Sequence, residues 1–444
     1  MNKIIETAQL ESFEKDFAAD PAKRVAQLAV TTNGVNKSAT DPFVQREDRH
    51  LFSIQLETGN ITNQKSSGRC WMFAALNTMR VEVMRRLNLE HFELSQNYTL
   101  FYDKLEKSNY FLENILDTLD EPTNGRLISH LLMAPLNDGG QWDMLCSLVE
   151  KYGVVPKDAM PETACSSSTR EVTYYMTRKL REFACVLREG HAAGKTAEQL
   201  REQKEAMLRC IYNMLCIALG NPPKTFTLEA RDKDKKFIRE TGLTGKSFFE
   251  KYIGWDLGSY VSLINATTAD KPFHKTFTVK MLGNIKEGRP VKYLNLPIEE
   301  LKQAAIRQMQ DGQPVWFGCD VGKSSIREGG IMDLDVLRPD QLFGTEFAMN
   351  KAQRLDYGES LMTHAMVFQG VNLDEDGKPT RWRVENSWGK ESGTEGYYVM
   401  SDDWFTEYTY QVVVNKKYLT EEQVKELEQE PIALEPWDPM GSLA

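Results

Sequence analysis

Residues 64–71 carry the stretch that decides the fold, Gln64-Lys65-Ser66-Ser67-Gly68-Arg69-Cys70-Trp71. After Cys70, apolar residues recur at helical spacing with no intervening proline or glycine, at Ala74, Met79, Val83 and Leu87. A lone cysteine before an apolar helix is usually a buried small residue. Cys70, however, falls in the first turn of the predicted helix, where unpaired N–H groups and the helix dipole favour the thiolate. We therefore expect Cys70 to be a nucleophile that attacks carbonyl groups.

An oxyanion site is expected beside this nucleophile. Gln64 lies six residues before Cys70, so the intervening loop can return its side-chain amide to the same place. The Gln64 amide and the backbone N–H of Cys70 would together stabilise the oxyanion that forms during acyl transfer.

A cysteine nucleophile needs a base, and the chain contains six histidines. Surface placement explains five of them, which sit among charged or loop residues: His50, His91, His130, His191 and His274. His364 instead opens the buried-strand pattern of residues 363–368, and Asn386 follows 22 residues later at the end of another predicted strand. Alone, each has an ordinary alternative, a satisfied core histidine and a turn. Together with Cys70 they match a Cys–His–Asn constellation, in which Asn386 orients the imidazole and Trp388 shields that hydrogen bond from water.

These segments resemble those of the papain-like cysteine proteases. Residues 67–71 are similar to the nucleophile signature of that superfamily, and Asn386-Ser387-Trp388-Gly389 is identical to its Asn segment. Ser67 stands where the superfamily usually has a cysteine, which removes a disulfide partner, and Arg69 stands where it has a small residue. His364 follows Cys70 by 294 residues, whereas the signature expects roughly 130–150. A large insertion is therefore predicted between them, with residues 155–295 as its natural place.

Further segments resemble the bleomycin hydrolase and aminopeptidase C branch of the superfamily. They are Asn137-Asp138-Gly139-Gly140-Gln141-Trp142, residues 358–364 and the C-terminal residues 437–444. The resemblance implies a homohexamer with active sites facing an internal channel, and a C-terminal tail lying in each cleft. It also places Gly139 and Gly140 on the cleft wall, where a missing Cβ lets a peptide backbone approach. An ordinary turn is the alternative for this Asp-Gly-Gly string.

The tail is expected to select substrates by their free N-terminus. Residues 440–444 carry no charged side chain, so the Ala444 carboxylate is their only formal charge. Held in the non-primed half of the cleft, that carboxylate would pair with the α-ammonium group of a peptide and block longer chains. The alternative is a surface tail without a role.

The order of predicted elements, helices first, then a mixed middle and a β-rich end, indicates an α+β fold. The resemblance implies the papain-like two-lobed form of it, a helical lobe and a β-barrel-like lobe, with an inserted helical and hook region for oligomerisation. We expect four parts. They are an N-terminal extension and helical lobe (1–154), the insertion (155–295), a β-rich lobe with His364 and Asn386 (296–434), and the C-terminal arm (435–444). Locally, we expect a loop at Thr31–Gly34 and a hairpin turn at Asp374–Gly377.

Composition excludes several classes of protein. The chain has 444 residues, of which 41% are hydrophobic and 27% charged, as is usual for globular proteins. No apolar stretch reaches the length of a membrane span, and the N-terminus lacks the apolar core of a secretory signal. Seven cysteines without a CxxC pair indicate a reduced, intracellular protein. The net charge of −10 argues against nucleic-acid binding, although residues 221–290 carry a local excess of positive charge.

We therefore expect a cytosolic cysteine aminopeptidase that hydrolyses N-terminal residues from peptides through a thioester acyl-enzyme. By resemblance, bleomycin-type amides are also expected substrates. No metal and no organic cofactor are implied, and the expected partners are peptides and further copies of the chain. The alternatives are a broad-specificity cysteine endopeptidase, an inactive peptidase-like scaffold and a nucleic-acid-binding protein.

Overall fold

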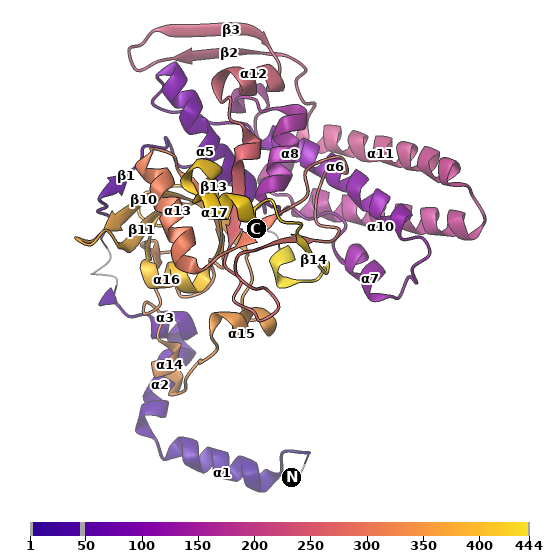
Figure 1. Cartoon of the computed structure of the whole chain (residues 1–444). Coiled ribbons are helices and arrows are strands. Elements are labelled where there is room, and N and C mark those ends of the chain that lie inside the picture. Colours follow the sequence, from indigo (N-terminus) through magenta and orange to yellow (C-terminus); the bar gives the residue numbers. More distant parts are fainter. Residues whose placement is uncertain (1–2, 45–48, 443–444) are drawn as a thin grey trace.

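Helices occupy one side of the molecule and one large sheet occupies the other (Figure 1). The structure is a computed structural model that describes residues 3–44 and 49–442. The helical side contains α5 (Cys70–Leu87), α6 (Gln96–Asp117), α7 (Arg126–Met133) and α8 (Trp142–Tyr152). α5 is buried along most of its length, which explains its apolar periodicity. Ser95 caps α6 by accepting a hydrogen bond from the Tyr98 amide at 3.1 Å.

The sheet has twelve strands and is mainly antiparallel at its centre. Its middle strand, β7 (Val315–Cys319), pairs with β13 (Thr409–Asn415) on one side and with β10 (His364–Leu373) on the other. Outward from β10 follow β11 (Pro379–Glu385), β12 (Tyr397–Ser401), β9 (Ile331–Met332) and β8 (Ser325–Ile326). Outward from β13 follow β4 (Tyr260–Ile264), β6 (Tyr293–Asn295), β5 (Lys275–Val279) and β14 (Ile432–Leu434), while β1 (Ile54–Gln55) pairs with β10. The strand predicted at residues 363–368, the strand predicted before Asn386 and the hairpin turn at Asp374–Gly377 are confirmed.

Both faces of the central strands are covered. Ala365 and Val367 pack into the core that contains the α5 side chains. Met366 and Phe368 point to the opposite face and pack into a second core with α13 (Ile298–Gln310). The first residue of β10, His364, is thus carried by a strand that is fixed from two sides.

The inserted region projects from the helical side. α10 (Arg170–Ala192) and α11 (Ala197–Leu219) form a helical pair that packs on α6, followed by a hairpin of β2 (Phe226–Arg231) and β3 (Phe237–Leu243) and by α12 (Gly245–Tyr252). The hairpin stands at the edge of the molecule (Figure 1). Residues 260–295 differ from expectation, because β4, β5 and β6 belong to the main sheet through the β4–β13 pairing. The division expected at residue 295 therefore cuts across the sheet.

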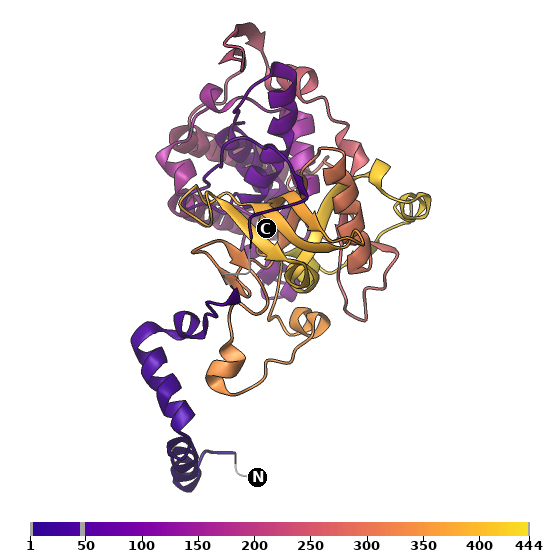
Figure 2. The ribbon, with the colours of Figure 1, turned by 90° about the vertical axis from the view of Figure 1, so that its left-hand side faces the viewer.

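The N-terminal helices form an arm that stands away from the body in both views (Figures 1 and 2). They are α1 (Thr7–Ala18), α2 (Pro21–Asn33) and α3 (Val35–Ala39), with α14 (Pro339–Phe343) against α3. The loop predicted at Thr31–Gly34 is wrong, since α2 continues to Asn33. The hydroxyls of Thr31 and Thr32 donate to carbonyls one turn back, so these residues remain helical. No helix in the described parts of the chain is long and apolar enough to cross a membrane.

One buried ion pair joins the two sides of the molecule. Arg80 on α5 lies 2.8 Å from Glu385 at the end of β11, and both side chains are almost completely excluded from solvent. Asn77, one turn earlier on α5, donates to the same carboxylate at 2.9 Å, and the Thr58 hydroxyl donates to its other oxygen. Burial raises the pKa of Glu385, while Arg80 and these donors lower it. The carboxylate is thus fully surrounded by donors from the helical side.

Replacing Arg80 tests this connection. Because Arg80→Met leaves the buried Glu385 carboxylate without its cation, we expect the free energy of unfolding to fall by about 3–5 kcal/mol. Urea unfolding followed by fluorescence measures it. The matched control is Arg85→Met on the same helix, since Arg85 pairs with Glu82 at the surface, and such pairs contribute at most about 1 kcal/mol. Equal losses for the two variants would contradict a role of the buried pair in joining the lobes.

Candidate active site

Cys70 is the first residue of α5, as predicted, and it is buried. The backbone N–H groups near its sulfur, those of Ala365, Trp71 and Cys70, favour the thiolate form. Burial nevertheless raises the pKa of the Cys70 thiol to about 11, although these N–H groups lower it. The N–H groups at the helix start favour the Cys70 thiolate, and burial opposes them.

His364 is the first residue of β10, and the next residue, Ala365, packs in the same core as Cys70. The imidazole Nε2 is 3.0 Å from Oδ1 of Asn386. Since that oxygen can only accept, Nε2 carries the proton and Nδ1 is left as an acceptor for the thiol. Burial lowers the pKa of His364 to about 4, while the hydrogen bond to Asn386 raises it. The Trp388 ring lies over the pair, with its centroid 4.8 Å from that of the imidazole.

Gln64 is held at both ends of its side-chain amide. Its Oε1 accepts a hydrogen bond from the Ser387 hydroxyl at 2.6 Å, and its Nε2 donates to the Ser67 carbonyl at 2.5 Å. The Gln64 backbone amide also donates to the Ser387 carbonyl at 2.8 Å. Gln64 is thus fixed between the loop before Cys70 and the segment after Asn386, and one N–H of Nε2 remains for an oxyanion. Ser387 had no separate signal in the sequence, although it stands inside the matched Asn segment.

Ser67 and Arg69, the two residues that depart from the usual signature, are hydrogen-bonded to each other, and Arg69 also binds Glu162. The buried Arg69 guanidinium donates to both carboxylate oxygens of Glu162, at 3.0 and 2.8 Å. Its Nε donates to the Ser67 hydroxyl at 2.9 Å, and that hydroxyl donates to the Gln64 carbonyl at 2.6 Å. A bidentate ion pair therefore fastens the loop that carries the nucleophile.

Gly139 and Gly140 lie next to the nucleophile helix. A Cβ on Gly140 would come within 2.6 Å of the Trp71 ring, so packing within the chain already requires glycine here. The Gly139 carbonyl accepts a hydrogen bond from Lys107 at 2.7 Å. In the part of the chain that the structure describes, neither the amide nor the carbonyl of Gly140 has a hydrogen-bond partner. The backbone of Gly140 is thus free to pair with a bound peptide.

The C-terminal tail crosses from one wall of this site to the other. The Ser442 hydroxyl donates to the carbonyl of Met362, two residues before His364, at 2.7 Å. The Ser442 carbonyl accepts from the side chain of Gln141, the residue after Gly140, also at 2.7 Å. Ala444, expected to carry the recognising carboxylate, lies outside the described residues.

Three side chains anchor the tail further back. The Tyr293 hydroxyl donates to the Met440 carbonyl at 3.1 Å. Lys271 pairs with Asp438 at 2.9 Å, and the Arg126 guanidinium lies 4.0 Å from the centre of the Trp437 ring. The partners of the tail are distant in the chain, so the sequence contained no signal for them.

Comparison with known proteins agrees with this geometry. The model of the Peptidase C1-like family matches residues 4–441. The chain belongs to this family. Within it, the chain is 51% identical to aminopeptidase C of Listeria monocytogenes serovar 1/2a, covering 98% of both chains. It is 43% identical to human bleomycin hydrolase, covering 96% of both.

A solved structure gives the same result for the fold. The crystal structure of PepW from Lactobacillus rhamnosis HN001 superposes with a TM-score of 0.98, at 50% identity over the whole of both chains. The predicted branch of the papain-like proteases, the α+β fold and the assignment as a papain-like cysteine peptidase are confirmed. Within residues 3–44 and 49–442, no group of three or more His, Cys, Asp or Glu side chains is arranged to hold a metal ion.

The contact between His364 and Asn386 generates a prediction about pH. Protonated His364 cannot accept the thiol proton, so activity should fall as the pH drops through the pKa of His364. Since the Asn386 hydrogen bond raises that pKa, Asn386→Ala should move the acid limb of kcat/KM to lower pH. The profile is measured with a fluorogenic aminoacyl substrate.

His364→Ala is the comparison variant for this measurement. It removes the base and should lower kcat by about 10²–10⁴, far more than Asn386→Ala. An acid limb that moves upward in Asn386→Ala, or equal losses of kcat in the two variants, would contradict an orienting role for Asn386.

Proposed function

We propose that this cysteine aminopeptidase removes residues from the N-termini of peptides with Cys70 as nucleophile and His364 as base. The observation that carries the proposal is the position of Ser442, which bridges the two walls of the cleft beside His364. A tail held there leaves room for only a short stretch of substrate before the scissile bond. The relatives named aminopeptidase C, which match the chain over nearly its whole length, support the same activity.

The chemistry uses Cys70 and His364 as a thiol–imidazole pair, and both residues are buried. His364 Nδ1 takes the thiol proton as the sulfur attacks the carbonyl carbon. The free N–H of Gln64 and the Cys70 amide receive the oxyanion. His364 then protonates the leaving amine, and the resulting thioester is hydrolysed by water that gives its proton to the same imidazole.

Three further features of the site support these reaction steps. Asn386 holds the imidazole tautomer and Trp388 covers their hydrogen bond. Gly139 and Gly140 form the wall along which the peptide backbone lies. The Ala444 carboxylate pairs with the α-ammonium of the substrate, which makes a free N-terminus the recognised group. The similarity to human bleomycin hydrolase extends the proposed substrates to related small amides.

Deleting residues 441–444 tests the role of the tail. Without the carboxylate, release of N-terminal residues from short peptides should fall at least tenfold in kcat/KM, and internal bonds of N-acetylated peptides should become substrates. Mass spectrometry of timed digests separates sequential trimming from internal cleavage. Cys70→Ala is the control for a contaminating peptidase and should abolish both. A truncated enzyme with an unchanged product pattern would refute the tail hypothesis.

We also propose that the enzyme assembles as a homohexamer in the cytoplasm. No residue of α1 or α2 is buried. The arm exposes large apolar side chains, namely Leu10, Phe13, Phe17, Val25 and Leu28. Such a face is typical of an interface, and self-association normally has closed symmetry. The inserted region, whose predicted role is oligomerisation, and this arm are the candidate contacts. All seven cysteines are free thiols, as expected in a reducing compartment.

The arm gives a test of assembly. Replacing Phe13 and Leu28 with serine should lower the sedimentation coefficient from that of a hexamer toward smaller species at micromolar concentration, because an apolar interface is lost. Lys15→Gln on α1 is the control with an unchanged apolar face. A wild-type protein that sediments as a monomer at moderate salt would contradict the hexamer and leave the catalytic residues unaffected.

A further inference from the structure

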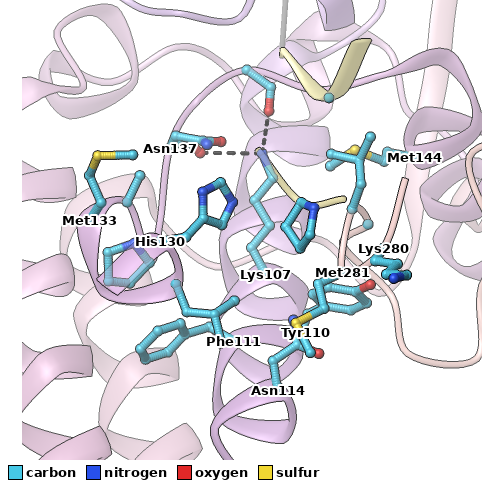
Figure 3. A pocket seen from close by; sticks show the side chains of 18 residues that line it. Lys107, Tyr110, Phe111, Asn114, His130, Met133, Asn137, Met144, Lys280 and Met281 are labelled. Carbon is cyan, nitrogen blue, oxygen red and sulfur yellow. Dashed lines mark hydrogen bonds between the residues drawn. The ribbon is translucent and has the colours of Figure 1, made fainter. Parts of the chain in front are cut away.

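The cleft wall is held from behind by two buried lysines of α6. Lys107 Nζ donates to the carbonyls of Asn137 at 3.2 Å and Gly139 at 2.7 Å. Lys104 Nζ donates to the Asn137 carbonyl at 3.0 Å and pairs with the Asp138 carboxylate at 2.5 Å. Figure 3 shows Lys107 extending from α6 to these carbonyls. The wall is thus fixed by hydrogen bonds to its own backbone.

Packing alone does not support the wall on this side. Lys107 and Gly139 border a cavity of about 420 Å³, which is also lined by His130, Met144 and Gly441 (Figure 3). No packed side chain fills that space, so the position of the Gly139 carbonyl depends on its ammonium donor. Burial raises the pKa of Asp103 and lowers that of Lys107, whose charges lie 2.8 Å apart. Buried ion pairs of this kind contribute little to the net stability of a fold. Stabilisation of the fold therefore does not explain why Lys107 and Asp103 are buried here.

Asp138 connects the same wall to the nucleophile. Its carboxylate accepts a hydrogen bond from the Gly68 amide at 3.0 Å, and its carbonyl accepts from the Trp71 indole at 2.7 Å. Gly68 and Trp71 flank Cys70 in the sequence, one on each side of the Arg69–Cys70 pair. A Cβ on Gly68 would lie 2.8 Å from the Asp138 Cβ, so the two loops touch. The distance between wall and nucleophile is therefore set through Asp138.

The direction of the Asn137 and Gly139 carbonyls determines which backbone groups of the wall face a peptide in the cleft. Since Lys107 donates to the Gly139 carbonyl, that carbonyl is directed toward the lysine. Gly140 has both backbone groups unpaired within the described residues. One residue with a free N–H and a free C=O is what an extended peptide needs for a pair of antiparallel hydrogen bonds.

We propose that Lys107 is a positioning residue for peptide binding, which turns the Gly139 carbonyl inward and so presents Gly140 to the backbone that lies in the cleft. Asp138 keeps this wall in register with Cys70. The inference rests on the proposed peptidase function, and it adds a determinant of KM that makes no contact with the reacting atoms.

The test separates peptide binding from thiol chemistry. The double variant Asp103→Asn/Lys107→Met removes both buried charges and keeps an acceptor for Asn284, which donates to Asp103 at 3.1 Å. We expect KM for unblocked tripeptides to rise at least tenfold, with a smaller change in kcat. The rate constant for alkylation of Cys70 by iodoacetamide, which needs no cleft wall, should stay within twofold of wild type. Lys179→Met, on the surface of α10, is the matched lysine control and should change neither.

A second variant covers the case in which the double variant does not fold. Lys107→Gln keeps a hydrogen-bond donor without the charge, so it should show a smaller rise in KM than loss of the donor produces. An unchanged KM in the folded variants would overturn the proposal. An alkylation rate that falls as much as kcat/KM would also overturn it, because Lys107 would then support the nucleophile. These ratios to wild type can be measured whether the enzyme trims N-termini or cleaves internally, so failure of the proposed function would be recognised separately.

Discussion

The pairing of Arg80 with Glu385 is the constraint on which the rest of the site depends. The nucleophile starts α5 and the orienting asparagine ends β11, and these two elements come from opposite sides of the molecule. Arg80 lies on the same helix as Cys70, and Glu385 is the neighbour of Asn386 in sequence. Because both partners are excluded from water, the carboxylate has no substitute for its donors from α5. The relative position of the catalytic groups is therefore fixed by a contact that touches none of them.

The same exclusion of water sets the reactivity of the site. Burial shifts the pKa of Cys70 upward and that of His364 downward, while the N–H groups near the sulfur and the Asn386 hydrogen bond oppose these shifts. A proton moves between them only when a bound carbonyl can accept the sulfur and nearby N–H groups can receive the oxyanion. The backbone N–H groups around Cys70, together with Gln64, are already in place and need no rearrangement.

Local patterns predicted the elements well and the connections poorly. The periodicity after Cys70 and the buried-strand pattern of residues 363–368 predicted the correct helix and strand, because each depends on neighbours in sequence. The loop expected at Thr31–Gly34 failed because α2 continues to Asn33 and ends at Gly34, which has a positive φ of 82°. The boundary near residue 295 failed because strand pairing joins residues more than 100 positions apart.

For the site, too, the sequence predicted the individual residues but not the contacts that support them. Cys70, His364, Asn386 and Gln64 were predicted from residue type, order and the family signature. The structure joins His364 to Asn386, and Gln64 to Ser387, the residue after Asn386. The sequence contained no signal for the Arg69–Glu162 pair, for Lys107 or for the partners of the tail. In a sequence, a charged residue that becomes buried cannot be distinguished from a charged residue at the surface. Their roles appear only when distant segments meet.

The way in which Arg69 and Glu162 fasten the nucleophile loop has a consequence for the conditions in which the enzyme can act. A thiol peptidase stays active only where reductants keep its cysteine reduced, and the same reductants exchange with any accessible disulfide nearby. A loop closed by sulfur would then be opened by the medium that its catalytic neighbour requires. A guanidinium and a carboxylate exchange no electrons with that medium. The shape of the loop and the oxidation state of Cys70 are thereby independent of each other.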